Sequence, residues 1–170
     1  PLIKAALNLR VGAGFDVYIY RGIAMNTKLH IGFKGKNNAS YILVKSISTD
    51  SYLLTNSFEG LKRDIENLDY SYDCVILFGI DKNLVNAVRI EKVAEKETKE
   101  YSLLNLEDLS AQLNAVGISN FLSDMPTHYL CNAAYWYLLR KFNGNAVLVH
   151  IPSIKNIDEN LKKGLKMVFS

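Results

Sequence analysis

The chain has 170 residues, enough for one packed domain and too few for two of ordinary size, because domains usually hold about 100–200 residues. Apolar residues make up 49% of the chain and charged residues 22%, a balance that excludes intrinsic disorder. The formal charge of +3 is a small excess over 17 acidic side chains and does not indicate a nucleic-acid partner.

The sequence gives no sign of a membrane span or of export. Its longest apolar runs, 74–78 and 146–149, are far shorter than the roughly 20 residues that cross a bilayer. The beginning of the chain lacks the basic, apolar and small-residue parts of a secretory signal. Two cysteines do not make a disulfide framework. We therefore expect a cytoplasmic protein with no membrane partner.

Short β-like runs alternate with segments of helical period, a pattern typical of a largely parallel sheet with helices on both faces. In the first half, the predicted strands are 29–33, 52–55 and 73–79. The predicted helices are 38–47, with Asn38 as its cap, and a segment capped by Ser57. Residues 73–79 are almost continuously apolar and end in glycine, which predicts a central strand buried on both faces.

The second half continues the alternation. Its predicted strands are 88–93, 118–122 and 146–151, the last of which ends at Pro152. Its predicted helices are one capped by Asn105 and ended by Gly117, one that opens at Thr127 or His128 and runs to 142, and one over 157–168. These elements predict a single α/β domain over 1–170.

Residues 1–26 fit this scheme less well. Residues 16–20 resemble a strand that follows a Gly12-Ala13-Gly14 turn. That turn is better interpreted as a loop than as a dinucleotide-binding fingerprint, because the third glycine and the following helix are missing. We expect this segment to pack on the same domain.

Cys131 is the first candidate for chemistry. It follows a turn that carries Pro126 and stands in the first turn of a predicted helix. Free amide hydrogens and the positive end of the helix dipole favour a thiolate at such a position. The alternative is that Cys131 is a small core residue, as most buried cysteines are.

His150 lies at the C-terminal end of an apolar strand, at the sheet edge where functional side chains collect. A histidine near Cys131 could take the thiol proton and later protonate a leaving amine. The alternative is a structural His150 bonded to backbone. His128, three residues before Cys131, is a weaker alternative base, because exposure at a helix entrance explains it. We interpret His30 as structural and Cys74 as inert packing.

Glu91 is the candidate that would orient the imidazole, because it interrupts an otherwise apolar β pattern. Other acidic residues compete for this role, although Glu95, Glu97 and Glu100 belong to a charged run of the kind that is usually solvated. Three scattered histidines and two distant cysteines lack metal-ligand spacing, and no phosphate-binding glycine loop occurs. The sequence therefore predicts no metal and no cofactor.

Five segments resemble, in order, those of a known enzyme family. The segments are Ile31-Gly32-Phe33, Ser57-Phe58-Glu59, Arg89-Ile90-Glu91-Lys92-Val93-Ala94, Tyr129-Leu130-Cys131-Asn132 and Val149-His150-Ile151-Pro152. They resemble the pyroglutamyl peptidase I family, cysteine peptidases that remove an N-terminal pyroglutamate from peptides. The third, fourth and fifth segments are similar to those that carry the family's catalytic glutamate, cysteine and histidine. The resemblance covers roughly 29–152.

This resemblance implies an α/β/α sandwich of the phosphorylase/hydrolase-like type, with Cys131, His150 and Glu91 as the catalytic residues. It also implies that Phe33 and Asp81 contact the substrate. Two segments depart from the family. Phe33 is followed by Lys34-Gly35-Lys36 in place of Pro-Phe-Gly-Gly, so an aromatic residue expected to hold the pyroglutamate ring is missing. The glycine-rich loop after the central strand is replaced by Asp81-Lys82-Asn83-Leu84.

Three hypotheses follow for the function. The first is a peptidase that removes an N-terminal pyroglutamyl or similar small acyl group through Cys131, His150 and Glu91. The second is a divergent relative without peptidase activity that serves as a binding or assembly module. The third is a cysteine hydrolase of another small amide. The expected partner is a peptide or small amide substrate, and the sequence leaves open whether the chain forms a homo-oligomer.

Overall fold

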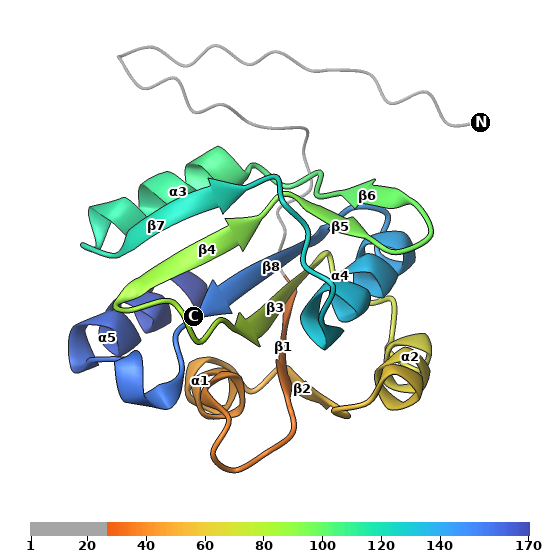
Figure 1. Cartoon of the computed structure of the whole chain (residues 1–170), viewed down its shortest axis with the longest axis horizontal. Helices are drawn as coiled ribbons and strands as arrows, with labels where there is room; N and C mark the ends of the chain where they lie inside the picture. Colours follow the sequence, from red (N-terminus) through yellow and green to blue (C-terminus); the bar gives the residue numbers. More distant parts are fainter. Residues whose placement is uncertain (1–26) are drawn as a thin grey trace.

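Six strands form one twisted sheet in the computed structural model, which describes residues 27–170 (Figure 1). The strands are β1 (Lys28–Phe33), β2 (Ser51–Leu54), β3 (Cys74–Ile80), β4 (Ala87–Glu91), β7 (Ser119–Ser123) and β8 (Ala146–Ile151). Their order in the sheet is β2-β1-β3-β8-β4-β7. Every neighbouring pair in this sheet is parallel except β4 and β8, which are antiparallel. The predicted largely parallel sheet is confirmed.

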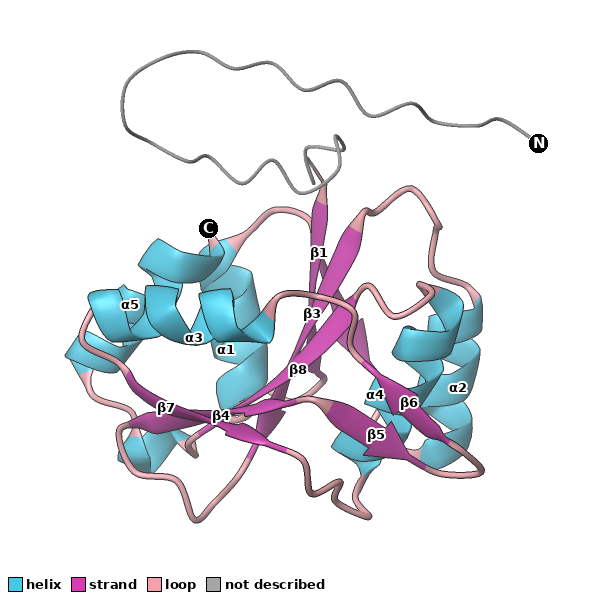
Figure 2. Cartoon of the chain, turned by 90° about the horizontal axis from the view of Figure 1, so that it is seen from above, coloured by secondary structure: helices cyan, strands magenta, loops and turns pink. Residues whose placement is uncertain are grey.

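Helices cover both faces of the sheet (Figure 2). The helices are α1 (Ala39–Ile47), α2 (Phe58–Glu66), α3 (Leu106–Ala115), α4 (Leu130–Lys141) and α5 (Glu159–Phe169), with a short 3-10 turn at Ile154–Asn156. α2 and α4 pack together on one face, which we call the α4 face. α1, α3 and α5 pack together on the other, which we call the α5 face. The predicted three-layer α/β/α sandwich is therefore confirmed.

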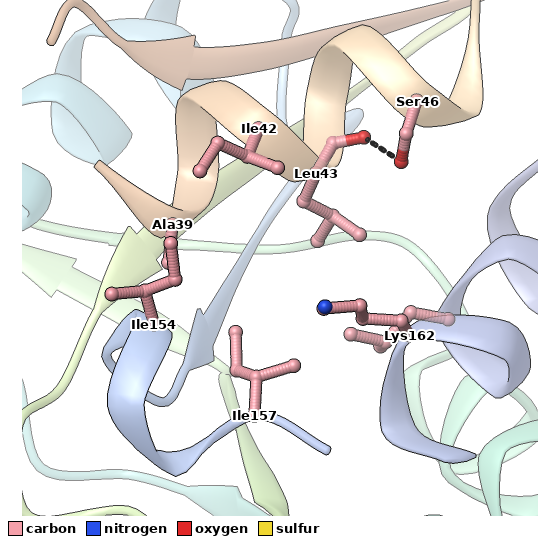
Figure 3. A pocket seen from close by; sticks show the side chains of 8 residues that line it. Ala39, Ile42, Leu43, Ser46, Ile154, Ile157 and Lys162 are labelled. Atoms are coloured by element: carbon pink, nitrogen blue, oxygen red, sulfur yellow. Dashed lines mark hydrogen bonds between the residues drawn. The ribbon is translucent and has the colours of Figure 1, made fainter. Parts of the chain in front are cut away.

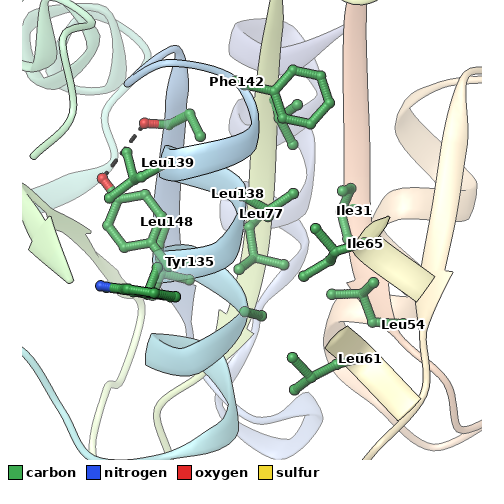
Figure 4. Packing of buried hydrophobic residues seen from close by; sticks show 14 of the residues in the cluster. Ile31, Leu54, Leu61, Ile65, Leu77, Tyr135, Leu138, Leu139, Phe142 and Leu148 are labelled. Carbon is green, nitrogen blue, oxygen red and sulfur yellow. Dashed lines mark hydrogen bonds between the residues drawn. The ribbon is translucent and has the colours of Figure 1, made fainter. Parts of the chain in front are cut away.

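Each face of the sheet has its own apolar core, because successive residues of a strand point to opposite faces. Leu77 of β3 and Leu148 of β8 point to the α4 face, where they pack with Leu138 of α4 (Figure 4). Phe78 points to the α5 face and meets the ring of Phe169 edge-on, with centroids 5.1 Å apart. Each such buried side chain contributes about 1.5–3 kcal/mol to stability.

Three predicted helix caps are confirmed. The side chain of Asn38 accepts a hydrogen bond from the Ser40 amide, and the side chain of Ser57 accepts one from the Gly60 amide. In the same way, the side chain of Asn105 accepts from the Asp108 amide. Each cap satisfies an amide that has no partner inside the helix and contributes about 1 kcal/mol.

Two predicted boundaries are wrong. The helix expected to open at Thr127 or His128 begins at Leu130, and its N-cap, Tyr129, makes no side-chain cap hydrogen bond. The strand expected over 88–93 ends at Glu91, because the chain turns at Lys92. The Lys92 amide donates to the Ser123 carbonyl oxygen, while the Lys92 carbonyl oxygen accepts from the Ser102 amide. Lys92 therefore lies between the last residue of β4 in the large sheet and the first residue of a separate element.

That separate element is a hairpin of β5 (Val93–Glu95) and β6 (Lys99–Tyr101). It lies beside α4, apart from the large sheet (Figure 2). The indole nitrogen of Trp136 donates to the Thr98 carbonyl oxygen at 3.0 Å, and Nη1 of Arg140 donates to Oε1 of Glu100 at 3.0 Å. The hairpin is therefore fixed to the helix that carries Cys131.

A small apolar cavity lies between α1 and α5 (Figure 3). Ile42, Leu43 and Ile157 line it, and the Lys162 side chain reaches toward it. The Lys162 ammonium is paired with Glu159, its Nζ lying 2.6 Å from Oε1. This cavity is on the α5 face.

The predicted turn at Gly12-Ala13-Gly14 and the predicted strand over 16–20 lie outside the described residues. Between residues 27 and 170, no helix is long and apolar enough to cross a membrane.

Candidate active site

Strand register places a row of polar positions on the α4 face. Gly79 of β3 lies opposite His150 of β8, and Arg89 of β4 lies opposite His150 from the other side. Glu91 lies opposite Leu148 in the same way. Residues directly opposite each other on neighbouring strands point to the same face. Because Leu148 belongs to the core under α4, His150, Arg89 and Glu91 also point toward that helix.

Gly79 is the point at which Cys131 and His150 come together. A Cβ atom at position 79 would lie 2.9 Å from Sγ of Cys131 and 3.1 Å from Nε2 of His150. These two atoms are therefore no more than about 6 Å apart, the sum of those distances. Among the described residues, no hydrogen bond joins these two side chains. Only glycine leaves this space open.

His150 is held by Glu91. Nδ1 of the imidazole lies 2.8 Å from Oε1 of the carboxylate, and the two residues are 3% and 2% exposed. An ionised carboxylate only accepts hydrogen bonds, so Nδ1 carries a hydrogen, and in the neutral imidazole Nε2 is the nitrogen with the lone pair. The sequence-predicted pair is thus joined, with the basic nitrogen directed toward Cys131.

Glu91 is ionised despite its burial. Burial would raise the pKa of its carboxyl group, but the hydrogen bonds from His150 and then from Arg89 outweigh burial and hold that pKa below its usual value. The backbone of Glu91 is also fixed, because its carbonyl oxygen accepts a hydrogen bond from the Tyr135 hydroxyl at 2.9 Å. This bond ties the strand to α4, four residues after Cys131.

Arg89 is a site residue that sequence reasoning missed. Its Nε donates to Oε1 of Glu91 at 2.6 Å, and its Nη1 donates to Oδ2 of Asp81. Its Nη2 lies 3.2 Å from Nδ1 of His150. The sequence did contain one indication of this role, since Arg89 and Glu91 are two positions apart and therefore lie on the same face of a strand.

The structure places the two residues predicted to contact substrate in different surroundings. Asp81 accepts from Arg89 through Oδ2 and from the Asn83 amide through Oδ1. Phe33 is 4% exposed and belongs to the apolar core of the α4 face. Substrate contact by either residue stays a prediction. His128, the alternative base, is exposed and lines a cavity of about 330 Å³ that also involves Phe58 and Tyr129.

Cys131 differs from the sequence-based expectation in its ionisation. Burial raises the pKa of its thiol to about 11, outweighing the backbone amides of Ile80 and Cys131 and the charge of Arg89, which lower it. The prediction of a thiolate at Cys131 is therefore wrong, because a thiol with this pKa carries its proton at neutral pH. The residue is half-buried, and its sulfur faces inward toward Gly79 rather than outward to water.

Asn132 fixes the position of Cys131 in the helix. Its side-chain oxygen accepts from the Glu95 amide at 3.1 Å, and its side-chain nitrogen donates to the Glu95 carbonyl oxygen at 2.6 Å. The first turn of α4 is therefore attached to β5. Such side-chain to backbone bonds leave no periodic signal in a sequence, which is why this role of Asn132 was not predicted.

Comparisons with known proteins agree on the fold. The chain is similar to pyrrolidone carboxyl peptidase from Thermus thermophilus, with a TM-score of 0.70 and 15% identity over 84% of this chain and 97% of that one. Pyroglutamyl peptidase I from Bacillus amyloliquefaciens gives a TM-score of 0.70 and 15% identity, covering 85% and 95%. The pyrrolidone carboxyl peptidase of Thermococcus litoralis gives 0.66 and 18%, covering 84% and 91%.

At these identities the likeness establishes the fold, and the predicted resemblance to pyroglutamyl peptidase I is confirmed at that level. No protein-family model and no curated protein matches the chain.

Proposed function

We propose that the chain is a cysteine peptidase in which Cys131 is the nucleophile, His150 the general base and acid, and Glu91 the residue that orients the imidazole. The observation that carries the proposal is the meeting of Cys131 Sγ and His150 Nε2 over Gly79, with Nδ1 bonded to Glu91. This is the arrangement of a nucleophile, a base and an orienting acid. The likeness in fold to solved peptidases supports it.

The protonated thiol determines the first step. Nε2 of His150 takes the proton of Cys131 as Sγ attacks the carbonyl carbon of the scissile amide. The resulting imidazolium is stabilised by Glu91 and then gives its proton to the leaving amine, so the C–N bond breaks and an acyl-enzyme remains. Water, deprotonated by the same nitrogen, then releases the acid and restores the thiol.

Backbone amides stabilise the charge that develops on the substrate oxygen. The amides of Ile80 and Cys131 lie close enough to Sγ to lower the pKa of the thiol. In the tetrahedral intermediate the oxyanion forms next to Sγ, so these fixed donors are placed to bind it.

The substrate we propose is a peptide with an N-terminal pyroglutamyl or similar small acyl group. The resemblance at the segments of Glu91, Cys131 and His150, together with the names of the structural neighbours, supports this class.

Hydrolysis of another small amide is the second candidate. It is favoured by Lys34, which follows Phe33 where the family carries further apolar residues. Nζ of Lys34 donates to Oγ1 of Thr55 at 2.8 Å and lies 3.8 Å from the Asp64 carboxylate, so this end of β1 is polar.

A panel of fluorogenic amides tests both candidates. Pyroglutamyl and other aminoacyl amides are compared on the native chain, on Cys131→Ser and on Cys74→Ser, a buried cysteine distant in the sequence. We expect turnover of at least one amide that is lost in Cys131→Ser and kept in Cys74→Ser. Turnover that survives Cys131→Ser would remove the nucleophile assignment. A folded chain with no turnover of any amide would favour the binding or assembly module.

A further inference from the structure

The guanidinium of Arg89 lies among three groups of the site, and no step of the proposed reaction uses it. Its side chain is 18% exposed, and its three nitrogens face Glu91, Asp81 and His150 separately. Asp81 in turn is 13% exposed and is fixed in its own turn by the Asn83 amide. Arg89 is therefore held at its far end by Asp81 and at its near end by Glu91.

Arg89 and Glu91 place opposite demands on Nδ1 of His150. Arginine only donates hydrogen bonds and an ionised carboxylate only accepts them, so Nδ1 can satisfy one of the two. If Nδ1 carries the hydrogen, it bonds Glu91 at 2.8 Å. If Nδ1 lacks the hydrogen, it can accept from Nη2 of Arg89 at 3.2 Å, but it then faces the carboxylate lone pairs at 2.8 Å. The first tautomer is favoured as long as Glu91 is ionised.

The charge state of Glu91 therefore decides which nitrogen of His150 is basic. A protonated carboxyl group would donate to Nδ1, and the ring hydrogen would then move to Nε2, which faces Cys131. In that tautomer Nε2 has no lone pair for the thiol proton. Glu91 is 2% exposed, so water does little to keep it ionised. The hydrogen bonds from His150 and from Arg89 at 2.6 Å do, and of these two donors only Arg89 is charged in every protonation state of His150.

We infer that Arg89, anchored by Asp81, is a positioning residue that keeps the Glu91 carboxylate ionised and in line with Nδ1, and so selects the His150 tautomer whose Nε2 accepts the Cys131 proton. This inference rests on the proposed function, since it gives Arg89 a role only through His150. It also gives Asp81 a role other than substrate contact, namely holding the arginine.

The test reads the tautomer directly. Long-range ¹H–¹⁵N NMR of the full chain, labelled on histidine, distinguishes a ring that carries its hydrogen on Nδ1 from one that carries it on Nε2. We expect the Nδ1 form for His150 in the native chain and mainly the Nε2 form in Arg89→Gln. Arg89→Lys keeps the charge but replaces the planar guanidinium, which binds Glu91 and Asp81 at the same time, with a single ammonium group. Asp81→Asn removes the charge that holds the far end of Arg89. Both variants should therefore give a mixture of the two His150 tautomers. Arg140→Gln is the matched control, because Arg140 pairs with Glu100 away from the site.

A second readout is the rate of Cys131 alkylation by iodoacetamide at neutral pH. If Nε2 of His150 carries the hydrogen in Arg89→Gln, it cannot take the thiol proton of Cys131, and alkylation should be roughly tenfold slower or more. Arg140→Gln should show no comparable change in the alkylation rate. Cys74→Ser serves as the background so that only Cys131 is measured.

The outcomes separate this inference from the proposed function. An unchanged tautomer and an unchanged alkylation rate in Arg89→Gln would overturn the inference, whatever the peptidase assays show. A tautomer shift in a chain that hydrolyses no amide would support the inference and reject the peptidase. If Arg89→Gln does not fold, Arg89→Lys and Asp81→Asn decide, because retention of the pure Nδ1 form in both would overturn the inference.

Discussion

The two buried histidines of this chain lie on opposite faces of the same sheet and have different surroundings. Each is 3% exposed. His150, on the α4 face, is bonded to Glu91 and lies close to Arg89 and Cys131. His30, on the α5 face, stacks on Phe78 with ring centroids 6.5 Å apart, and neither of its nitrogens has a hydrogen-bond partner of normal geometry. Burial alone therefore does not distinguish the two histidines. The charged partners around the His150 ring do.

The largest effect that we expect separates the two histidines directly. His150→Gln removes the base and should lower kcat/KM at least about 10⁴-fold, because loss of the base in such a triad removes most of the catalysis. His30→Gln should leave kcat/KM within a few-fold of the native value. The measurement is hydrolysis of the preferred amide by both folded variants. Equal losses of kcat/KM in the two variants would show that His150 has no special role in the reaction.

Removing the acidic partner of His150 should have the next largest effect. Glu91→Gln keeps the shape of the side chain but not its charge, so the imidazolium loses its stabilising partner, and we expect kcat/KM to fall by up to about 10⁴-fold. Glu100→Gln is the control, since Glu100, on the hairpin, pairs with Arg140 of α4 and not with His150. A Glu91→Gln enzyme with native kcat/KM would show that His150 acts without an orienting carboxylate.

Filling the space at Gly79 should have a smaller effect. In Gly79→Ala the new methyl group would lie 2.9 Å from Sγ of Cys131 and 3.1 Å from Nε2 of His150, so the two side chains must move apart. We expect about a hundredfold loss of kcat/KM and a free energy of unfolding lowered by about 1–3 kcal/mol.

The control for Gly79→Ala is Gly164→Ala. Its new Cβ would approach the flexible end of Ile118 on the α5 face at 2.7 Å. This variant should lose stability at most and keep its kcat/KM. A similar loss of activity in both variants would mean that general loosening, and not the contact at Gly79, explains the result.

The smallest effect concerns the pH dependence of stability at His30. Burial lowers the pKa of His30 below 6.5, and the backbone of Phe169 offsets only part of this. The unfolded chain therefore binds a proton first as the pH falls. The contribution of His30 to stability is constant above about pH 6.5 and declines below it by up to about 1.4 kcal/mol per pH unit, until the folded-state pKa is reached.

Urea unfolding at pH 7, 6 and 5 tests this, with His30→Leu as the variant that cannot titrate. The difference in free energy of unfolding between the native chain and His30→Leu should shift in favour of His30→Leu as the pH falls. A difference that stays constant from pH 7 to pH 5 would show that the pKa of His30 is the same in the folded and the unfolded chain, which would contradict the prediction.

The sequence predicted the fold well because the fold depends on patterns that repeat. Alternating apolar runs and helical stripes located the strands and helices, and side chains such as Asn38, Ser57 and Asn105 marked helix starts. The turn at Lys92 was missed because Val93 continues the apolar pattern of β4 although the chain has already left the sheet.

The site was predicted less completely, for a different physical reason. Cys131, His150 and Glu91 could be proposed from their positions and from the resemblance. The roles of Arg89 and Tyr135 depend on how β4 is placed against β8 and α4, and no local pattern encodes that. The ionisation of Cys131 depends on which way the sulfur faces, so a rule based on the helix start alone gave the wrong sign.

The place of β8 in the sheet has a consequence for synthesis of the chain. β8 is the last of the described strands in the sequence, yet it lies between β3 and β4 and carries His150. While the ribosome is still adding residues 146–151, the sheet lacks its middle and β4 has no partner on that side. A nascent chain that lacks β8 therefore contains Cys131 but neither His150 nor the strand that carries it. The approach of Cys131 Sγ to His150 Nε2 over Gly79 can form only after β8 has been synthesised and has entered the sheet between β3 and β4.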